Sequence, residues 1–265
     1  MTSRRKLLIQ SGALVAASTA GCFGIGSPDL AESEYPPGTS KEGIDDPAEV
    51  LQATRSSISN NGYKIIFEKS NPGHTKSRYQ SSLKQKRHFR SIKHPTEEYG
   101  VFINGSDIYF KSSATGNTKF YKSATDKSFK NFHASGGFLN EEFPNGVKFI
   151  SANTLTNING SRQVSGMIKF GDYTPEQVIE TKGEKLLEFD LKSADLEAMD
   201  IEYLDRESKN LNGKVRMDFE STVHSAFIER EVSLGGEEET IRHSFELQKS
   251  GTVSISRPTW VQEEF

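Results

Sequence analysis

Cys22, the only cysteine in this chain of 265 residues, is the side chain best placed for covalent chemistry. It directly follows the small residues Thr19-Ala20-Gly21, which let a signal peptidase approach the backbone closely. The motif resembles a lipobox, in which the cysteine sulfur receives a lipid and the cysteine becomes the mature N-terminus. Because stable anchoring takes more than one acyl-length chain, two chains on one cysteine would hold the protein on a membrane without spanning it.

The segment before Cys22 has the three parts of an export signal. Arg4-Arg5-Lys6 supply a positive start, and residues 7–20 form an apolar stretch that is too short to span a bilayer. The arginine pair favours the twin-arginine route, with a general secretory signal that happens to carry two arginines as the alternative. We therefore predict a signal peptide over residues 1–21 and a lipid-anchored protein on the extracytoplasmic face of the cell membrane.

The rest of the chain divides into a linker and one domain. Residues 22–45 are rich in Gly, Pro and acidic side chains, so we expect a flexible tether with a reach on the order of 25 Å. Residues 46–265 form the single domain, and an aromatic content of 10% argues against disorder. Because there is no second cysteine, neither a disulfide framework nor a thiolate zinc site can form.

Turn signals and polarity patterns predict the elements of this domain. A helix is expected over residues 46–59, with Asp46 as N-cap and Pro47 at the first helical position, and a second helix at about 144–157. Alternating polarity predicts strands at 62–69, 76–92 with a bend, 97–103, 106–112, 117–122, 163–170, 185–192, 198–204, 213–221, 224–233, 239–248 and 251–257. Asn104-Gly105 is the sharpest hairpin signal. We predict an α+β fold, a strongly curved antiparallel meander sheet shaped as a half-barrel, with a few helices covering one face.

The order of these segments resembles a known group of proteins. A Thr-Ala-Gly-Cys signal, an acidic linker, a helix leading into a Gly-Tyr strand, a long meander and a closing segment from Ser250 to Trp260 are similar in layout to haloarchaeal lipoproteins of unknown function exported by the twin-arginine route. Those proteins resemble bacterial lipoprotein carriers and mycobacterial lipid-binding lipoproteins. The resemblance implies a hydrophobic or amphiphilic ligand in a concave cavity of the sheet, and no catalytic residues.

Side chains on the inward face of the sheet are the candidates to line such a cavity. They are Tyr63, Ile65, Phe67, Val101, Ile103, Phe189, Leu191, Met217 and Phe219. If they line a void, the protein is a carrier. If they interlock with the helices, the alternative is favoured, a cell-surface structural or protein-interaction module without a small-molecule ligand. The sequence leaves the identity of a protein partner open.

Charge is unevenly distributed along the domain. Residues 61–133 carry 14 Lys or Arg against 5 Asp or Glu, and residues 134–265 carry 14 against 24. Such asymmetry would orient the domain over an anionic surface or recruit an anionic ligand, and cross-strand pairs that neutralise the two halves are the alternative. Basic residues alternate with aromatic ones between Arg78 and Arg90. We interpret them as a solvated strand face rather than a nucleic-acid site.

The sequence contains no pattern typical of catalysis or cofactor binding, so we expect no enzyme activity, no cofactor and no metal site. His88 with His94 and His224 with His243 are the histidine pairs that folding would bring together, and half-exposed surface histidines are the better interpretation. Trp260 is expected to cover the sheet edge. Asn104 and Asn159 each begin an Asn-Gly-Ser sequon, a candidate for glycosylation in an exported protein.

Overall fold

The computed structural model describes residues 28, 30–70, 73–124, 129, 142–143, 147–148, 161–181, 183–199, 208–234, 236–249 and 253–265. Several predicted features lie outside these residues: the export signal with Arg4 and Arg5, the lipidation site Cys22 and the sequon at Asn159. Among the described helices, none combines the length and the apolar character that a membrane span requires.

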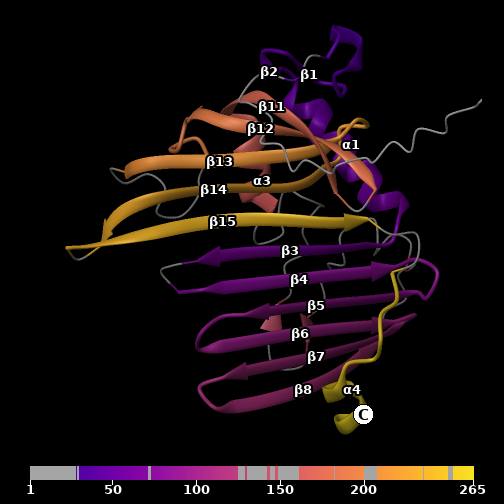
Figure 1. Ribbon diagram of the computed structural model, residues 1–265. Coiled ribbons are helices and arrows are strands. Elements are labelled where there is room, and N and C mark those ends of the chain that lie inside the picture. Colours follow the sequence, from indigo (N-terminus) through magenta and orange to yellow (C-terminus); the bar gives the residue numbers. More distant parts are fainter. Residues whose placement is uncertain are drawn as a thin grey trace, which may run out of the picture.

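One open antiparallel sheet of eleven strands dominates the described chain (Figure 1). Its order is β11-β12-β13-β14-β15-β3-β4-β5-β6-β7-β8. The strands are β3 (Tyr63–Ser70), β4 (Thr75–Ser82), β5 (Arg87–Lys93), β6 (Glu97–Asn104), β7 (Asp107–Ala114), β8 (Asn117–Ala124), β11 (Gly171–Thr181), β12 (Glu184–Ala194), β13 (Ser208–Asp218), β14 (Val223–Leu234) and β15 (Glu237–Lys249). The sheet is curved but not closed, since β11 and β8 are both edge strands. The predicted fold class is confirmed.

Shorter elements surround this sheet. The helices are α1 (Pro47–Asn60), α3 (Ser161–Phe170) and α4 (Thr259–Glu264), with a 3-10 turn η1 at Glu32–Glu34. Two short hairpins pair β1 (Thr39–Ser40) with β2 (Gly43–Ile44) and β9 (Glu142–Phe143) with β10 (Val147–Lys148).

Two meanders make up the large sheet. Strands β3 to β8 pair in sequence order, as do strands β11 to β15, and the antiparallel pair of β15 with β3 joins the two. In this pair Phe245 lies opposite Phe67 and Leu247 lies opposite Ile65. The joint therefore places the first long strand of the chain in the middle of the sheet.

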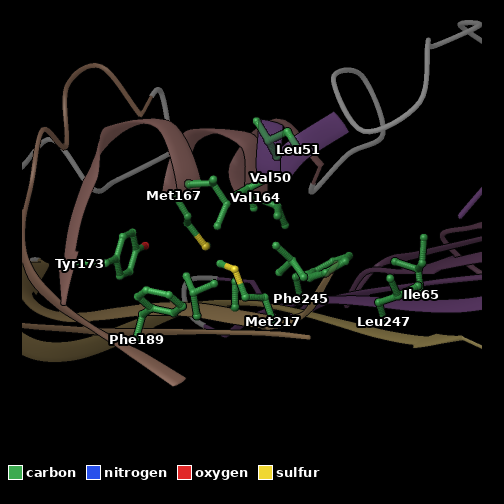
Figure 2. Packing of buried hydrophobic residues seen from close by; sticks show 14 of the residues in the cluster. Val50, Leu51, Ile65, Val164, Met167, Tyr173, Phe189, Met217, Phe245 and Leu247 are labelled. Carbon is green, nitrogen blue, oxygen red and sulfur yellow. The ribbon is translucent and has the colours of Figure 1, made fainter. Parts of the chain in front are cut away.

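Helices α1 and α3 cover one face of the sheet, which we call the inner face. The helices pack against each other and against β14, and α3 also contacts β11 and β15. Val50 and Leu51 of α1 and Val164 and Met167 of α3 point toward the sheet (Figure 2). We call the apolar cluster between these helices and the strands β3 and β11–β15 the main core.

The start of α1 follows the sequence prediction. The Asp46 carboxylate accepts hydrogen bonds from the backbone N–H groups of Ala48 and Glu49 at 3.0 and 3.1 Å, which satisfies two of the open donors at a helix start. On the buried side, the Thr54 hydroxyl accepts a hydrogen bond from the backbone N–H of Val223 at 3.0 Å. A polar side chain within the helix thus ties α1 to the first residue of β14.

The other face, which we call the outer face, is crossed by the C-terminal segment 253–265 (Figure 1). Ile255 and Val261 of this segment pack with Phe102 and Tyr109 of β6 and β7 in an apolar cluster of their own. The strand predicted at 251–257 is not formed among its described residues. They are held by side-chain packing and by hydrogen bonds of the Ile255 backbone with the side chains of Gln85 and Arg87, rather than by pairing with a neighbouring strand.

Trp260 has the structural role that the sequence predicted. Its ring stacks on Phe120 of the edge strand β8, with centroids 6.1 Å apart. A Cβ on Gly100 of β6 would meet the indole at 3.4 Å. The tryptophan therefore covers the outer face from β6 to β8, which is more than the edge alone.

The hairpin between β6 and β7 forms at the predicted place. Gly105 adopts a φ of 64°, which suits the left-handed turn that an Asn-Gly pair favours. The sequon residue Asn104 is exposed at this turn. Its side-chain oxygen accepts a hydrogen bond from Nε of Arg87 at 3.1 Å.

The region around α3 differs from the sequence prediction. Residues 163–170, expected as a strand, belong to this helix, because Val164 and Ile168 recur at helical spacing and are both buried. The sequence predicts no strand at β11, since Pro175 and many polar residues interrupt the apolar pattern of this edge strand. Of the helix expected at 144–157, the described residues Val147–Lys148 form β10.

The domain begins earlier than the sequence predicted. The hairpin of β1 and β2 lies within the stretch 22–45 that was expected as a tether, and Tyr35 is buried. Gly43 lies so close to β11 that a Cβ would clash with the carbonyl oxygen of Tyr173. Residues 30–45 are therefore packed on the domain, and a free tether can involve only the residues before them.

We predict that Gly43→Ala destabilises the domain by about 2 kcal/mol or more, because the new methyl group forces the hairpin away from Tyr173. For a domain of this size the melting temperature should fall by about 4–8 °C. The control is Gly105→Ala, where φ is also positive but nothing lies within 4 Å, so only about 1 kcal/mol is lost. Equal melting temperatures for the two variants would contradict the docking of the hairpin.

Candidate functional site

A stripe of polar side chains crosses the inner face of β3, β4 and β5 at the border of the main core, to which the tyrosines of the stripe also belong. We call these residues the polar stripe: Tyr63, Ser77, Tyr79, Ser81, His88 and Arg90. Tyr63 lies opposite Ser81, which in turn lies opposite His88, and Tyr79 lies opposite Arg90. Strand alternation produces this arrangement, because residues two positions apart share one face of a sheet.

The stripe is deeply buried for a set of polar groups. Tyr79 and His88 are 0% exposed and Tyr63 is 1% exposed. The Arg90 guanidinium lies 5.3 Å from the centre of the Tyr79 ring, so its charge faces the electron-rich ring face. The stripe is a connected set of contacts rather than a row of isolated groups.

Burial controls the protonation of these side chains. Burial raises the pKa of Tyr79, against the opposing effect of the Arg90 charge, and it lowers the pKa of Arg90. Burial also raises the pKa of Tyr63, where a hydrogen bond with Ser81 opposes the shift. Both phenols therefore keep their protons at neutral pH and can donate hydrogen bonds.

Apolar side chains flank the stripe on both sides. The main core lies on the side of β15, and a second cluster lies on the side of β6 and β7. This second cluster consists of Val101, Ile103, Ile108 and Phe110, with Phe129 packed against it. A polar band on one buried face thus separates two hydrocarbon surfaces.

The residues predicted to line a cavity are divided between these two clusters. Tyr63, Ile65, Phe67, Phe189 and Met217 are buried in the main core, Leu191 and Phe219 pack against it with partial exposure, and Val101 and Ile103 belong to the second cluster. Figure 2 shows Phe189 and Met217 facing the side chains of α1 and α3. The side chains of the main core therefore interlock with the helices.

Three histidines are buried, where the sequence predicted surface positions. His88 is 0%, His243 1% and His224 8% exposed. The predicted pairs do not form, because His243 lies opposite Ile228 and His94 follows β5 at an exposed position. The strand register explains the error. His88 and His243 each lie two residues from a side chain that faces inward, and residues two positions apart share one face of a strand.

The basic stretch from Arg78 to Arg90 is also divided by register. Arg78 lies on the outer face and is exposed, as the solvated-face interpretation predicts. His88 and Arg90 lie on the inner face, so that interpretation is wrong for them. Arg230 of β14, 0% exposed, is a further cation on the inner face.

This arrangement can bind the polar group of a partly apolar molecule. A guanidinium and an imidazole donate hydrogen bonds to carboxylate or phosphate oxygens, and the hydroxyl groups of the stripe donate or accept them. The apolar clusters on either side can bury hydrocarbon. The sequence missed this feature because its polar members look like a solvated face until the register of β5 is known.

A cluster of carboxylates on the outer face of β11 and β12 has the composition of a metal site. However, the Lys214 ammonium occupies its centre, 2.6 Å from Glu176, 2.8 Å from Glu188 and 2.9 Å from Asp190. Arg216 binds the second oxygen of Glu188. We interpret the cluster as an ion-pair network that links β11, β12 and β13.

The comparisons with known proteins give distant structural likenesses only. No family model matches the chain, and no curated protein matches it. Among solved structures, it is similar to the lipoprotein LppX of Mycobacterium tuberculosis, with 9% identity and a TM-score of 0.38 over 80% of this chain and 100% of that one. It is also similar to MucB in complex with MucA, with 8% identity and a TM-score of 0.26 over 83% of this chain and 60% of that one.

A third similar structure is a DUF1329 family protein from Desulfovibrio piger, with 8% identity and a TM-score of 0.20 over 78% of this chain and 93% of that one. The haloarchaeal part of the resemblance and the twin-arginine route stay predictions.

The ion-pair network generates a prediction about acid stability. Burial raises the pKa of Glu188, but hydrogen bonds from Lys214, Gln177 and Arg216 outweigh it and hold the pKa at about 2. Because the pKa is lowered in the folded protein, this carboxylate stabilises the fold above its ordinary pKa near 4.5, and the contribution is lost as the pH falls toward 2.

Glu188→Gln should therefore lower the free energy of unfolding at pH 7 by about 2–4 kcal/mol and flatten its decline between pH 5 and pH 2.5. Urea unfolding at a series of pH values measures both effects. The control is Glu197→Gln, an exposed position without an ion pair in the described chain. A pH profile of Glu188→Gln as steep as that of the unchanged protein would disprove the role of the network.

Proposed function

We propose that this protein is a lipid-anchored, extracytoplasmic binding protein, without enzyme activity, for an amphiphilic ligand. The observation that carries the proposal is the polar stripe between two apolar clusters on one buried face of the sheet. An amphiphile has the matching order of groups, a polar head joined to hydrocarbon. We therefore assign the head group to the stripe and the hydrocarbon to the neighbouring cluster.

The polar groups of the inner face select one half of it for the ligand. Under α1 and α3 the side chains of the main core interlock, with Leu187, Phe189 and Met217 at 0% exposure, and the second cluster is buried as deeply, with Phe110 at 0% exposure. We place the ligand on the half formed by β4 to β7, because the donors that can hold a head group lie where the stripe meets the second cluster.

The energetics of such a site are favourable for a long-chain molecule. Each buried methylene contributes about 0.8 kcal/mol. A charge-assisted hydrogen bond to a head group adds about 1.5–3 kcal/mol and fixes its position. Arg90 is the residue best suited to this contact, because its guanidinium lies on the ring of Tyr79 beside the second cluster.

A second candidate function is a cell-surface structural or protein-interaction module without a small-molecule ligand. The observation that favours it is the interlocked packing of the main core with α1 and α3. The two functions differ in whether a small molecule is bound at the half of the inner face formed by β4 to β7. A bound molecule of defined mass belongs to the first candidate alone.

We predict that the protein purified from its own membrane carries an amphiphile, which native mass spectrometry followed by lipid extraction would detect. Arg90→Met removes the charge but keeps a long side chain, so bound amphiphile should fall about tenfold. The control is Met217→Leu in the main core, which should retain it. Thermal melting of both variants tests whether the fold is intact.

An empty protein in this experiment would refute ligand binding and favour the interaction module. Equal loss of amphiphile in the two variants, with unchanged melting temperatures, would mean that the stripe is not the head-group site. Loss in Arg90→Met alone supports the assignment.

The lipid anchor gives a separate prediction. Cys22→Ser removes the only thiol of the chain, so a high-salt wash, which screens electrostatic attachment, should release the protein from the membrane fraction. Ser27→Ala, just beyond the motif, should leave it in the membrane. Mass spectrometry of the N-terminal peptide should find two lipid chains on residue 22 of the unchanged protein. Retention of Cys22→Ser in the membrane after the high-salt wash would overturn the anchor.

A further inference from the structure

The outer face of β3, β4 and β5 carries an excess of positive charge. We call it the basic face: Lys64 of β3, Lys76 and Arg78 of β4, and Arg87 and Lys93 of β5. Glu68 is the acidic residue of these three strands. Glu246 of the neighbouring strand β15 lies opposite Ile66 at the border of the face.

Cross-strand pairs leave this excess in place. The Lys76 ammonium forms an ion pair with the Glu68 carboxylate at 2.8 Å. Arg87 donates a hydrogen bond to the carbonyl oxygen of Ile255 at 2.9 Å. Pairs such as Lys111 with Glu98 also lie within the basic half of the chain. The ion-pair network of Lys214 lies within the acidic half, so these pairs do not neutralise one half with the other.

Lys64, Arg78 and Lys93 have no carboxylate within 4.0 Å among the residues that the structure describes. Arg78 lies opposite Ile66 on β3 and opposite Ser91 on β5, which places the three cations on a diagonal across adjacent strands. From strand spacing and rise, successive Cα atoms on this diagonal are about 8 Å apart. The exposed turn between β4 and β5 adds Lys84 and Lys86 at one end of the face.

The side chains of this face suit a partner with many negative charges. Between the cations lie Ile66, Gln80 and Ser91, which are partly exposed and mostly polar, and the lysines are long and flexible. A planar array of phosphates can meet such a diagonal without matching a specific shape, since each Lys or Arg acts through its charge. This chemistry favours lipid head groups over a folded protein.

The short tether keeps such a surface within reach. If Cys22 carries the anchor, seven residues lie between it and Leu30, which packs against the main core. The eight Cα–Cα steps from Cys22 to Leu30 span at most about 28 Å when the chain is fully extended, which is less than the width of eleven strands at about 4.8 Å each. The anchored domain therefore stays in contact distance of the bilayer.

We propose that the basic face docks the domain on anionic lipid head groups of the membrane that holds its anchor, an inference that rests on the proposed anchoring. Docking this face turns the inner face away from the bilayer. The test uses the mature chain 22–265 with Cys22→Ser, which has no lipid, so its outcome does not depend on whether the anchor exists. The probe is a vesicle of 30 mol% phosphatidylglycerol in phosphatidylcholine, compared with pure phosphatidylcholine.

Sedimentation with vesicles should show binding to the anionic vesicles and at least tenfold weaker binding to the neutral ones at low salt. Lys64→Gln, Arg78→Gln and Lys93→Gln together should reduce binding to the anionic vesicles at least tenfold. The matched control is Lys169→Gln, Lys185→Gln and Lys192→Gln, three exposed lysines outside the basic face with the same change in net charge.

Two outcomes would overturn the docking surface. If the control variant loses as much binding to anionic vesicles, the net charge of the protein, and not the position of the cations on the basic face, causes the binding. Equal binding to neutral vesicles, or none to anionic vesicles, would exclude head-group recognition. If the Cys22→Ser protein stays in the membrane fraction after the high-salt wash, but the vesicle experiment gives the expected binding, the anchor is disproved and the docking surface is supported.

Discussion

The pairing of β15 with β3 is the constraint on which the rest of the molecule depends. It joins strands separated by most of the domain, with Phe245 opposite Phe67 and their rings 5.3 Å apart. A slip of one residue would turn every side chain of one meander to the opposite face. This single register therefore decides for both meanders which residues lie under α1 and α3 and which face the C-terminal segment. Closing so long a loop costs entropy before the contacts form, and the aromatic pair at the joint offsets part of that cost.

Once this register is set, β6 has to be buried on both faces, and so does β5 at Phe89. His88 and Arg90 take the inner face of β5, which leaves Phe89 on the outer face. The run Val101-Phe102-Ile103 of β6 has the continuous apolar character of a doubly buried strand. The C-terminal segment 253–265 is the cover that the outer face of these strands requires. The same alternation thus explains the polar stripe on one side and the position of Trp260 on the other.

What the sequence could predict follows from how local each signal is. The cap at Asp46 and the Asn104-Gly105 turn are set by neighbouring residues, and both form where the sequence places them. The strand predicted at 163–170 fails because a short apolar run fits either period, and only packing against β14 and β15 selects the helix. The inward positions of His88 and Arg90 depend on pairing with β4, which no local pattern encodes. The predicted lining residues were found by alternation, but their division between two clusters needed the tertiary structure.

The buried polar groups of the inner face also bear on function through their energetic cost. A cation and phenols in an apolar setting destabilise a fold unless they are well paired, and apolar replacements of similar volume often stabilise a protein. A domain with only a structural task would be more stable with an apolar inner face throughout β3 to β7. Tyr79 and Arg90 instead keep a polar band at the border of two clusters, where it interrupts what would otherwise be one continuous core. The ion-pair network around Lys214 shows that the outer face holds even the buried carboxylate of Glu188 when two cations pair with it. This placement of charge inside the sheet, with Arg90 paired to Tyr79, is the reason for proposing that the stripe recognises a polar group.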